Sequence, residues 1–158
     1  MAKKPEKTNA MRLLDQKKVQ YRVHDYSQSG MIAGEDVAKV LGEDPSQVFK
    51  TLVTVGKTGQ HYVFLVPVCS ELDLKKAASA VGEKYIEMIK SKDLLGLTGY
   101  IHGGCSPVGM KKIFPTTIDS SAQRLDKIFF SAGKIGLQLE VQVADIEKVI
   151  KYQFAEIC

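Results

Sequence analysis

One lysine stands within a strand-like, largely apolar segment of the chain. Alternation over residues 48–55 places Val48, Lys50 and Leu52 on the same face of a strand. A lysine between two apolar residues either extends to solvent or supplies a positive charge inside a cleft, and the pattern alone favours solvent. In a cleft, its ammonium group would act as a preorganised electrostatic group.

Two glycine-containing segments could present backbone N–H groups to a ligand. Gly103 and Gly104 precede Ser106 and Pro107, and residues 131–134 read Ser-Ala-Gly-Lys. Glycine allows a positive φ and a close approach of the backbone. Donors of this kind can stabilise a carbonyl oxygen as charge develops on it. Both segments are also typical of tight turns, so the residues alone leave both interpretations open.

Other chemical patterns are weak in this sequence. His102 and Cys105 could form a nucleophilic pair, but that chemistry depends on spatial geometry and a lowered thiol pKa. The Gly-Lys-Thr at 56–58 lacks the first glycine of a phosphate-binding loop, because position 51 is threonine. No Cys-x-x-Cys pair or dinucleotide-binding glycine pattern occurs. We therefore expect no metal and no cofactor.

The elements that must position these residues follow from hydrophobic periodicity and turn residues. Helices are predicted over residues 8–18, 35–41, 70–81, 91–95 and 145–150. Strands are predicted over residues 21–26, 48–55, 61–68, 84–88, 116–119, 127–131, 137–141 and 153–157. Ser70, followed by Asp73, is predicted to cap the third helix. Helices interspersed with hairpins favour a mixed-sheet α/β or α+β domain.

Length, charge and hydropathy limit the class of protein. A chain of 158 residues suits one domain, and it has no apolar run long enough to cross a bilayer. Residues 1–24 carry seven basic and two acidic side chains within a total net charge of +4. This segment could approach RNA or form a solvated helix face. The three cysteines are widely spaced, so we expect reduced thiols in the cytoplasm. We expect neither a membrane nor DNA as a partner.

Three segments in order resemble one family. VFKTLV (48–53), LTGYIHGGCSPVGMKK (97–112) and FFSAGKIGLQLEV (129–141) are similar to the YbaK-type Cys-tRNA(Pro) deacylases, relatives of the editing domain inserted in prolyl-tRNA synthetase. The resemblance covers essentially the whole chain. It implies one α/β domain over residues 1–158, with a mixed, curved β-sheet surrounded by helices. It also implies removal of cysteine from mischarged tRNA(Pro), with Cys-tRNA(Cys) as a second candidate substrate and prolyl-tRNA synthetase as a partner.

The resemblance also implies roles for particular residues. The catalytic residue would be Lys50, and the substrate-binding residues would be Tyr26, Thr51, Gly103, Gly104, Ser106, Pro107, Ser131 and Gly133. The substrate's own thiol would attack its ester carbonyl and release a cyclic thiolactone, so Cys105 receives no catalytic role. Met31 and Ile32 stand where the family often has an aromatic residue. An alanine-specific deacylase and a non-catalytic tRNA-binding module are the alternatives.

Overall fold

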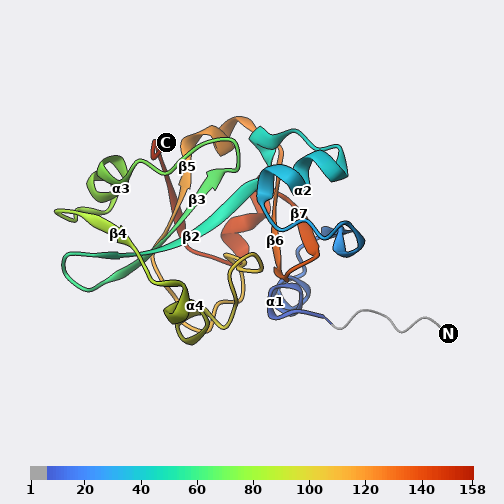
Figure 1. Cartoon of the computed structure of the whole chain (residues 1–158), viewed down its shortest axis with the longest axis horizontal. Coiled ribbons are helices and arrows are strands. Elements are labelled where there is room, and N and C mark those ends of the chain that lie inside the picture. The colour runs from blue at the N-terminus through green and yellow to red at the C-terminus, as the bar shows by residue number, and fades with distance from the viewer. Residues whose placement is uncertain (1–6) are drawn as a thin grey trace.

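The computed structural model describes residues 7–158, in which helices and strands follow one another along the chain (Figure 1). The helices are α1 (Asn9–Gln16), α2 (Gly34–Leu41), α3 (Leu74–Val81) and α4 (Ser91–Thr98). The strands are β1 (Tyr21–Asp25), β2 (Phe49–Gly56), β3 (His61–Pro67), β4 (Ile86–Met88), β5 (Thr116–Asp119), β6 (Lys127–Lys134), β7 (Leu137–Gln142) and β8 (Tyr152–Ala155). Short 3₁₀ helices cover Ser27–Ser29, Pro45–Gln47, Ser120–Arg124 and Val143–Lys148. The basic residues Lys3 and Lys4 lie outside the described part.

The strands form two hydrogen-bonded groups. An antiparallel group has the order β1–β7–β6, and a second group has the order β4–β2–β3–β5–β8. The second group is mixed, because β4, β2 and β3 pair antiparallel whereas β3, β5 and β8 pair parallel. An isolated parallel bridge between Val48 and Phe129 joins the two groups. The predicted α/β fold with a mixed sheet is confirmed. Its strands form two hydrogen-bonded groups, and this bridge is the point where they meet.

The two faces of β6 pack into different hydrophobic clusters. Phe130 packs with Ala10 and Leu14 of α1 in the main hydrophobic core, whereas Phe129 packs with Ala38 of α2 in a smaller cluster. Figure 1 shows α1 and α2 on opposite sides of β6 and β7. Adjacent residues of a strand point to opposite faces, so this arrangement follows from the alternation along β6. It places the start of α2 beside the junction of the two sheets.

Capping residues set several of the helix ends. The hydroxyl of Thr8 accepts a hydrogen bond from the Met11 N–H at 3.2 Å and begins α1. Gly42 and Gly82 end α2 and α3 in the left-handed conformation, with φ of 68° and 75°. The predicted cap at Ser70 is wrong. The Asp73 carboxylate begins α3 by accepting from two backbone N–H groups, because it reaches both donors at once.

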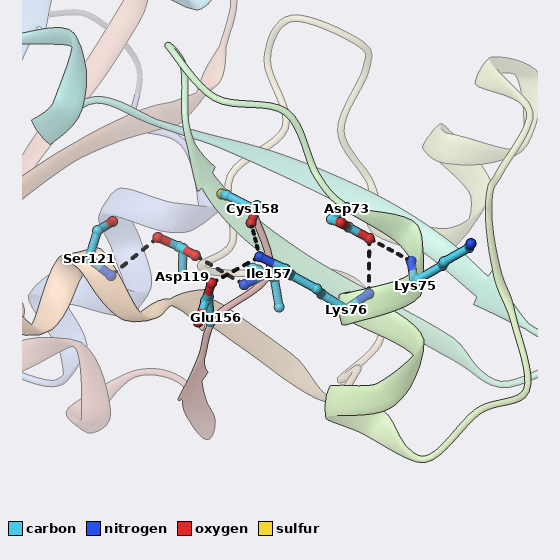
Figure 2. Close-up of polar contacts among 8 residues, drawn as sticks. All are labelled: Asp73, Lys75, Lys76, Asp119, Ser121, Glu156, Ile157 and Cys158. Carbon is cyan, nitrogen blue, oxygen red and sulfur yellow. Dashed lines mark hydrogen bonds and ion pairs between the residues drawn. The ribbon is translucent and has the colours of Figure 1, made fainter.

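The C-terminal segment is fastened by polar contacts with neighbouring elements, as Figure 2 shows. One oxygen of Asp119, at the end of β5, accepts from the Ile157 N–H at 3.1 Å. The Lys76 ammonium of α3 donates to Glu156 at 2.9 Å and to the Cys158 carbonyl at 2.7 Å. These contacts hold residues 156–158 between α3 and β5 and leave β8 as the outer strand of its sheet.

Other boundaries also differ from the sequence prediction, and β6 runs to Lys134 instead of ending at residue 131. The predicted helix over 145–150 is instead the 3₁₀ helix Val143–Lys148, and α4 extends to Thr98 instead of ending at residue 95. In the last turn of α4, the Thr98 hydroxyl donates to the Leu94 carbonyl one turn earlier, at 2.8 Å. Within residues 7–158, no helix combines the length and apolar character needed to span a bilayer.

Candidate active site

A cavity of about 730 Å³ lies where the two sheets meet. One wall is the first half of β2, and the opposite wall comes from β6 and β7. The start of α2, the residue Leu94 of α4 and the loop after α4 complete the lining. Segments far apart in the sequence therefore line one cavity that opens to solvent and has the size of a small-molecule site.

Lys50 lines this cavity from β2. Its side chain is 30% exposed, and its ammonium nitrogen lies 3.7 Å from a carboxylate oxygen of Glu71. The Glu71 side chain is itself 95% exposed. An ion pair with such an exposed partner is weak, so the Lys50 cation stays available to an incoming anion. The alternation pattern favoured open solvent for this lysine, whereas the structure places it at the cavity.

The glycine loop contributes only one of its four predicted residues to the lining. Gly103 borders the cavity with φ of 84°, and a Cβ there would lie 2.6 Å from a methyl carbon of Ile32. A Cβ at Gly104 would lie 2.9 Å from the backbone nitrogen of Ile135, so this residue packs on the β6–β7 turn. Ser106 and Pro107 are buried behind the loop and do not line the cavity.

The Ser-x-Gly segment of β6 also lines the cavity with only one of its two predicted residues. Ser131 lines the cavity, and its hydroxyl accepts a hydrogen bond from the Gly133 N–H at 3.1 Å. Gly133 has φ of 95°, and a Cβ there would lie 2.6 Å from the ring of Tyr100. The Tyr100 hydroxyl donates to the Val108 carbonyl at 2.7 Å. Tyr100 therefore braces both glycine-containing segments from behind, and Gly133 serves this packing rather than the lining.

Tyr26 and Thr51 complete the predicted residues that line the cavity. Tyr26 follows β1, is 6% exposed, and has its phenol pKa raised by burial. The Thr51 hydroxyl is buried and has no hydrogen-bond partner within residues 7–158. The cavity thus gathers five of the nine predicted residues, namely Tyr26, Lys50, Thr51, Gly103 and Ser131.

Comparison with known proteins supplies the family. The aminoacyl-tRNA editing domain matches residues 31–149, which include most of the cavity-lining residues. The chain belongs to the aminoacyl-tRNA editing domain family. The resemblance found in the sequence is therefore confirmed at the level of the family.

Relatives of this editing domain are similar to it over nearly the whole chain. A protein of Enterococcus faecalis (strain ATCC 700802 / V583), named as the Cys-tRNA(Pro)/Cys-tRNA(Cys) deacylase EbsC, is 48% identical over 99% of this chain and 98% of its own. The solved structure of a trans-editing protein for prolyl-tRNA synthetase has a TM-score of 0.85 at 23% identity, covering 99% of this chain and 98% of that one. The protein APE2540 has a TM-score of 0.83 at 18% identity, covering 94% and 99%. These two structures support the fold.

Sequence reasoning missed part of the lining of the editing domain. The first residues of α2, Gly34–Val37, border the cavity, as does Ile32 in the position where an aromatic residue was expected. Gln138 of β7 also lines it and stands opposite Ser131 in the strand register. The signal for Gln138 was available: it is a polar residue between Leu137 and Leu139, on the same face as the predicted serine.

Cys105 lines the cavity of the editing domain but is a poor nucleophile there. It is 8% exposed, and burial raises its thiol pKa to about 11, which a hydrogen bond with Thr98 only partly offsets. About one thiol in 10,000 would then be ionised at neutral pH. His102 is exposed, whereas Cys105 is buried. Residues 7–158 also contain no cluster of three or more side chains suited to a metal ion.

Proposed function

We propose that this editing domain is a trans-acting deacylase that cleaves the ester of Cys-tRNA(Pro), with Cys-tRNA(Cys) as a second substrate. The proposal draws on the name of the Enterococcus relative, which is 48% identical over 99% of the chain. The observation that carries it is the convergence of Lys50, Gly103 and Ser131 on one cavity. A cation, a close backbone approach and a hydroxyl are the groups that an aminoacyl ester needs for binding and orientation.

The reaction that fits this cavity uses the substrate's thiol as the nucleophile. The cysteine sulfur attacks the ester carbonyl, a carbon–sulfur bond forms, and the bond from the carbonyl carbon to the ribose oxygen breaks. The thiol proton passes to the departing ribose oxygen. The products are a cyclic cysteine thiolactone and tRNA with a free terminal hydroxyl. Orientation of two groups in one molecule can contribute about 7–11 kcal/mol, so the protein mainly needs to fix the conformation.

Each of the three groups has a distinct task in this scheme. The Lys50 ammonium holds the negatively charged end of the tRNA, because its ion-pair partner in the described part of the chain is the exposed Glu71. The backbone at Gly103 approaches the ester where a side chain would collide with Ile32. Ser131 has a fixed direction, since its hydroxyl oxygen accepts from the Gly133 N–H and its own proton remains for the substrate.

A protein nucleophile is not needed and is poorly supported. The raised pKa of Cys105, about 11, leaves it protonated at neutral pH. We expect Cys105→Ser to retain most of the deacylase activity in a single-turnover assay. A folded Cys105→Ser protein without activity would instead favour a thiol nucleophile from the enzyme.

A panel of charged tRNAs tests the substrate assignment. The protein is incubated with Cys-, Ala-, Ser- and Pro-tRNA(Pro), and with Cys-tRNA(Cys), and the remaining ester is measured with time. We expect rapid loss of both cysteinyl esters, with a thiolactone among the products, and slow loss of the others. Faster loss of alanine than of cysteine would identify an alanine deacylase. Binding of tRNA without any cleavage would identify a non-catalytic module.

We also propose that tRNA(Pro) is selected together with prolyl-tRNA synthetase in the cytoplasm. A cavity of about 730 Å³ can enclose an aminoacyl adenosine but not the body of a tRNA, so the identity of the tRNA is read elsewhere. The resemblance to editing proteins points to the synthetase as the source of this selectivity. Adding the synthetase should raise the rate on Cys-tRNA(Pro) more than the rate on Cys-tRNA(Cys), and equal effects would contradict the partnership.

A further inference from the structure

A buried amide in the cavity lacks one of its hydrogen bonds. Gln138 is 3% exposed and lines the cavity from β7, opposite both Ser131 and His24 in the register of the sheet. Its amide nitrogen donates to a carboxylate oxygen of Glu43 at 2.9 Å. Its carbonyl oxygen is buried and has no partner among the described residues. Buried polar atoms are rarely left unpaired, so a free acceptor in a cavity indicates a missing donor.

Glu43 determines which end of this amide is left without a partner. Glu43 follows α2, and its backbone N–H donates to the Ala38 carbonyl at 2.9 Å, which fixes the residue in place. An ionised carboxylate only accepts hydrogen bonds, so Gln138 must turn its NH₂ group toward Glu43 and its carbonyl away. Burial raises the pKa of Glu43, and the hydrogen bond from Gln138 is the main contact that favours its ionised form.

The chemistry of an aminoacyl ester narrows the choice of donor. Its ester oxygens only accept, so the available donors are the α-ammonium, the thiol and a ribose hydroxyl. The α-ammonium forms the strongest hydrogen bond of the three because it is charged. Glu35 and Asp36, in the first turn of α2, line the same cavity and add negative potential. This combination favours a positively charged group near Gln138.

We propose that the Gln138 carbonyl binds the α-ammonium of the aminoacyl group and that Glu43 is the positioning residue that orients it. This inference rests on the proposed deacylase function and adds a requirement to it. The cavity selects substrates with a free α-amino group. Aminoacyl-tRNAs blocked at nitrogen, such as formylated or peptidyl-tRNA, are therefore spared.

The test removes the ammonium from the substrate and the acceptor from the protein in turn. The substrates are Cys-tRNA(Pro) and 3-mercaptopropionyl-tRNA(Pro), which differ only in the α-ammonium. Each rate is divided by the uncatalysed rate of the same ester, which corrects for the different reactivity of the two thiols. We expect wild-type kcat/KM to be about 10- to 100-fold lower for the analogue, as for loss of a charge-assisted hydrogen bond.

The variant Gln138→Met keeps a side chain of similar length without the acceptor. It should lose activity on Cys-tRNA(Pro) by a similar factor and should no longer distinguish the two substrates. The matched control is Gln142→Met, an exposed residue of the same strand, which should behave as wild type. A Gln138→Met protein that still discriminates as wild type does would overturn the inference.

Glu43→Gln provides a second variant, and it is decisive if Gln138→Met does not fold. A neutral amide can donate or accept, so the orientation of Gln138 is no longer fixed. We expect the ratio between the two substrates to fall several-fold, a readout that a merely structural role of Glu43 would not change. An unchanged ratio overturns the role of Glu43. A wild-type protein that cleaves neither ester instead overturns the proposed function itself, and the inference with it.

Discussion

Replacing Lys50 by alanine should remove most of the activity and very little stability. The ammonium nitrogen of Lys50 lies 3.7 Å from Glu71, whose side chain is 95% exposed, and Lys50 itself is 30% exposed. Exposed pairs of this kind contribute about 0–1 kcal/mol to folding. A change of that size shifts the melting temperature of a chain of this length by about 2–4 °C at most. A larger loss of stability would show that Lys50 has a structural role.

The expected loss of activity follows from the electrostatics of the site. A unit charge about 4 Å from another contributes about 4 kcal/mol at the effective dielectric near a protein surface. A hydrogen bond to a charged group contributes about 1.5–3 kcal/mol. Because Lys50 remains partly exposed to water, we expect about 2–4 kcal/mol, which corresponds to a decrease in kcat/KM of about 30- to 1,000-fold.

Single-turnover deacylation of Cys-tRNA(Pro) measures this effect. The matched control is Lys57→Ala, an exposed lysine in the turn after the same strand. It removes the same charge from the protein but not from the cavity. A Lys50→Ala rate within about threefold of wild type, which is less than 1 kcal/mol, would refute the electrostatic role of Lys50. Equal losses in both variants would assign the effect to the overall charge of the protein.

Three further predictions concern packing, reactivity and pH. Gly104→Ala should lower the free energy of unfolding, measured in urea, by about 1–3 kcal/mol, because its Cβ would lie 2.9 Å from a backbone nitrogen. Gly96→Ala should raise the free energy of unfolding by about 0.5–1 kcal/mol, because its Cβ would have no atom within 4 Å. Iodoacetamide near neutral pH should modify exposed Cys69 and spare Cys105, whose pKa burial raises to about 11, as mass spectrometry of peptides would show. Burial raises the pKa of Glu140, but a histidine hydrogen bond and nearby cations outweigh it and lower that pKa below 4.5. This carboxylate therefore stabilises the fold above pH 4.5 and loses its effect as the pH falls through the lowered value, so Glu140→Gln should weaken the dependence of urea stability on pH in acid.

Local sequence signals predicted the elements well where one interaction decides the structure. The hairpin of β2 and β3 follows from two alternating segments around a glycine turn, and Thr8 caps α1 as its position predicts. The error at Ser70 arose because two residues of suitable type lie three apart, and it is Asp73 whose carboxylate accepts from the first N–H groups of the helix. The choice between them depends on where the chain leaves β3, which no local pattern specifies.

The candidate site was predictable in its motifs but not in the tasks of individual residues. Gly103 and Gly104 are adjacent and chemically identical, yet one borders the cavity and the other packs on the turn between β6 and β7. That difference depends on Ile135, more than 30 residues later in the chain. The role of Gln138 likewise depends on Glu43, which lies 95 residues away in the sequence. Contacts between distant segments decide both cases.

The division between lining and supporting residues explains how this site can work without an activated side chain. Tyr100 braces both glycine-containing segments, and the sheet register places Ser131 opposite Gln138. The scaffold therefore positions three groups, namely the Lys50 cation, the backbone of Gly103 and the oriented amide of Gln138. If the substrate carries its own nucleophile, fixed directions are sufficient for catalysis, because the barrier is then mainly one of conformation. If the substrate thiol is the nucleophile, an ester without a thiol that enters the cavity lacks this nucleophile, so the same mechanism accounts for selectivity.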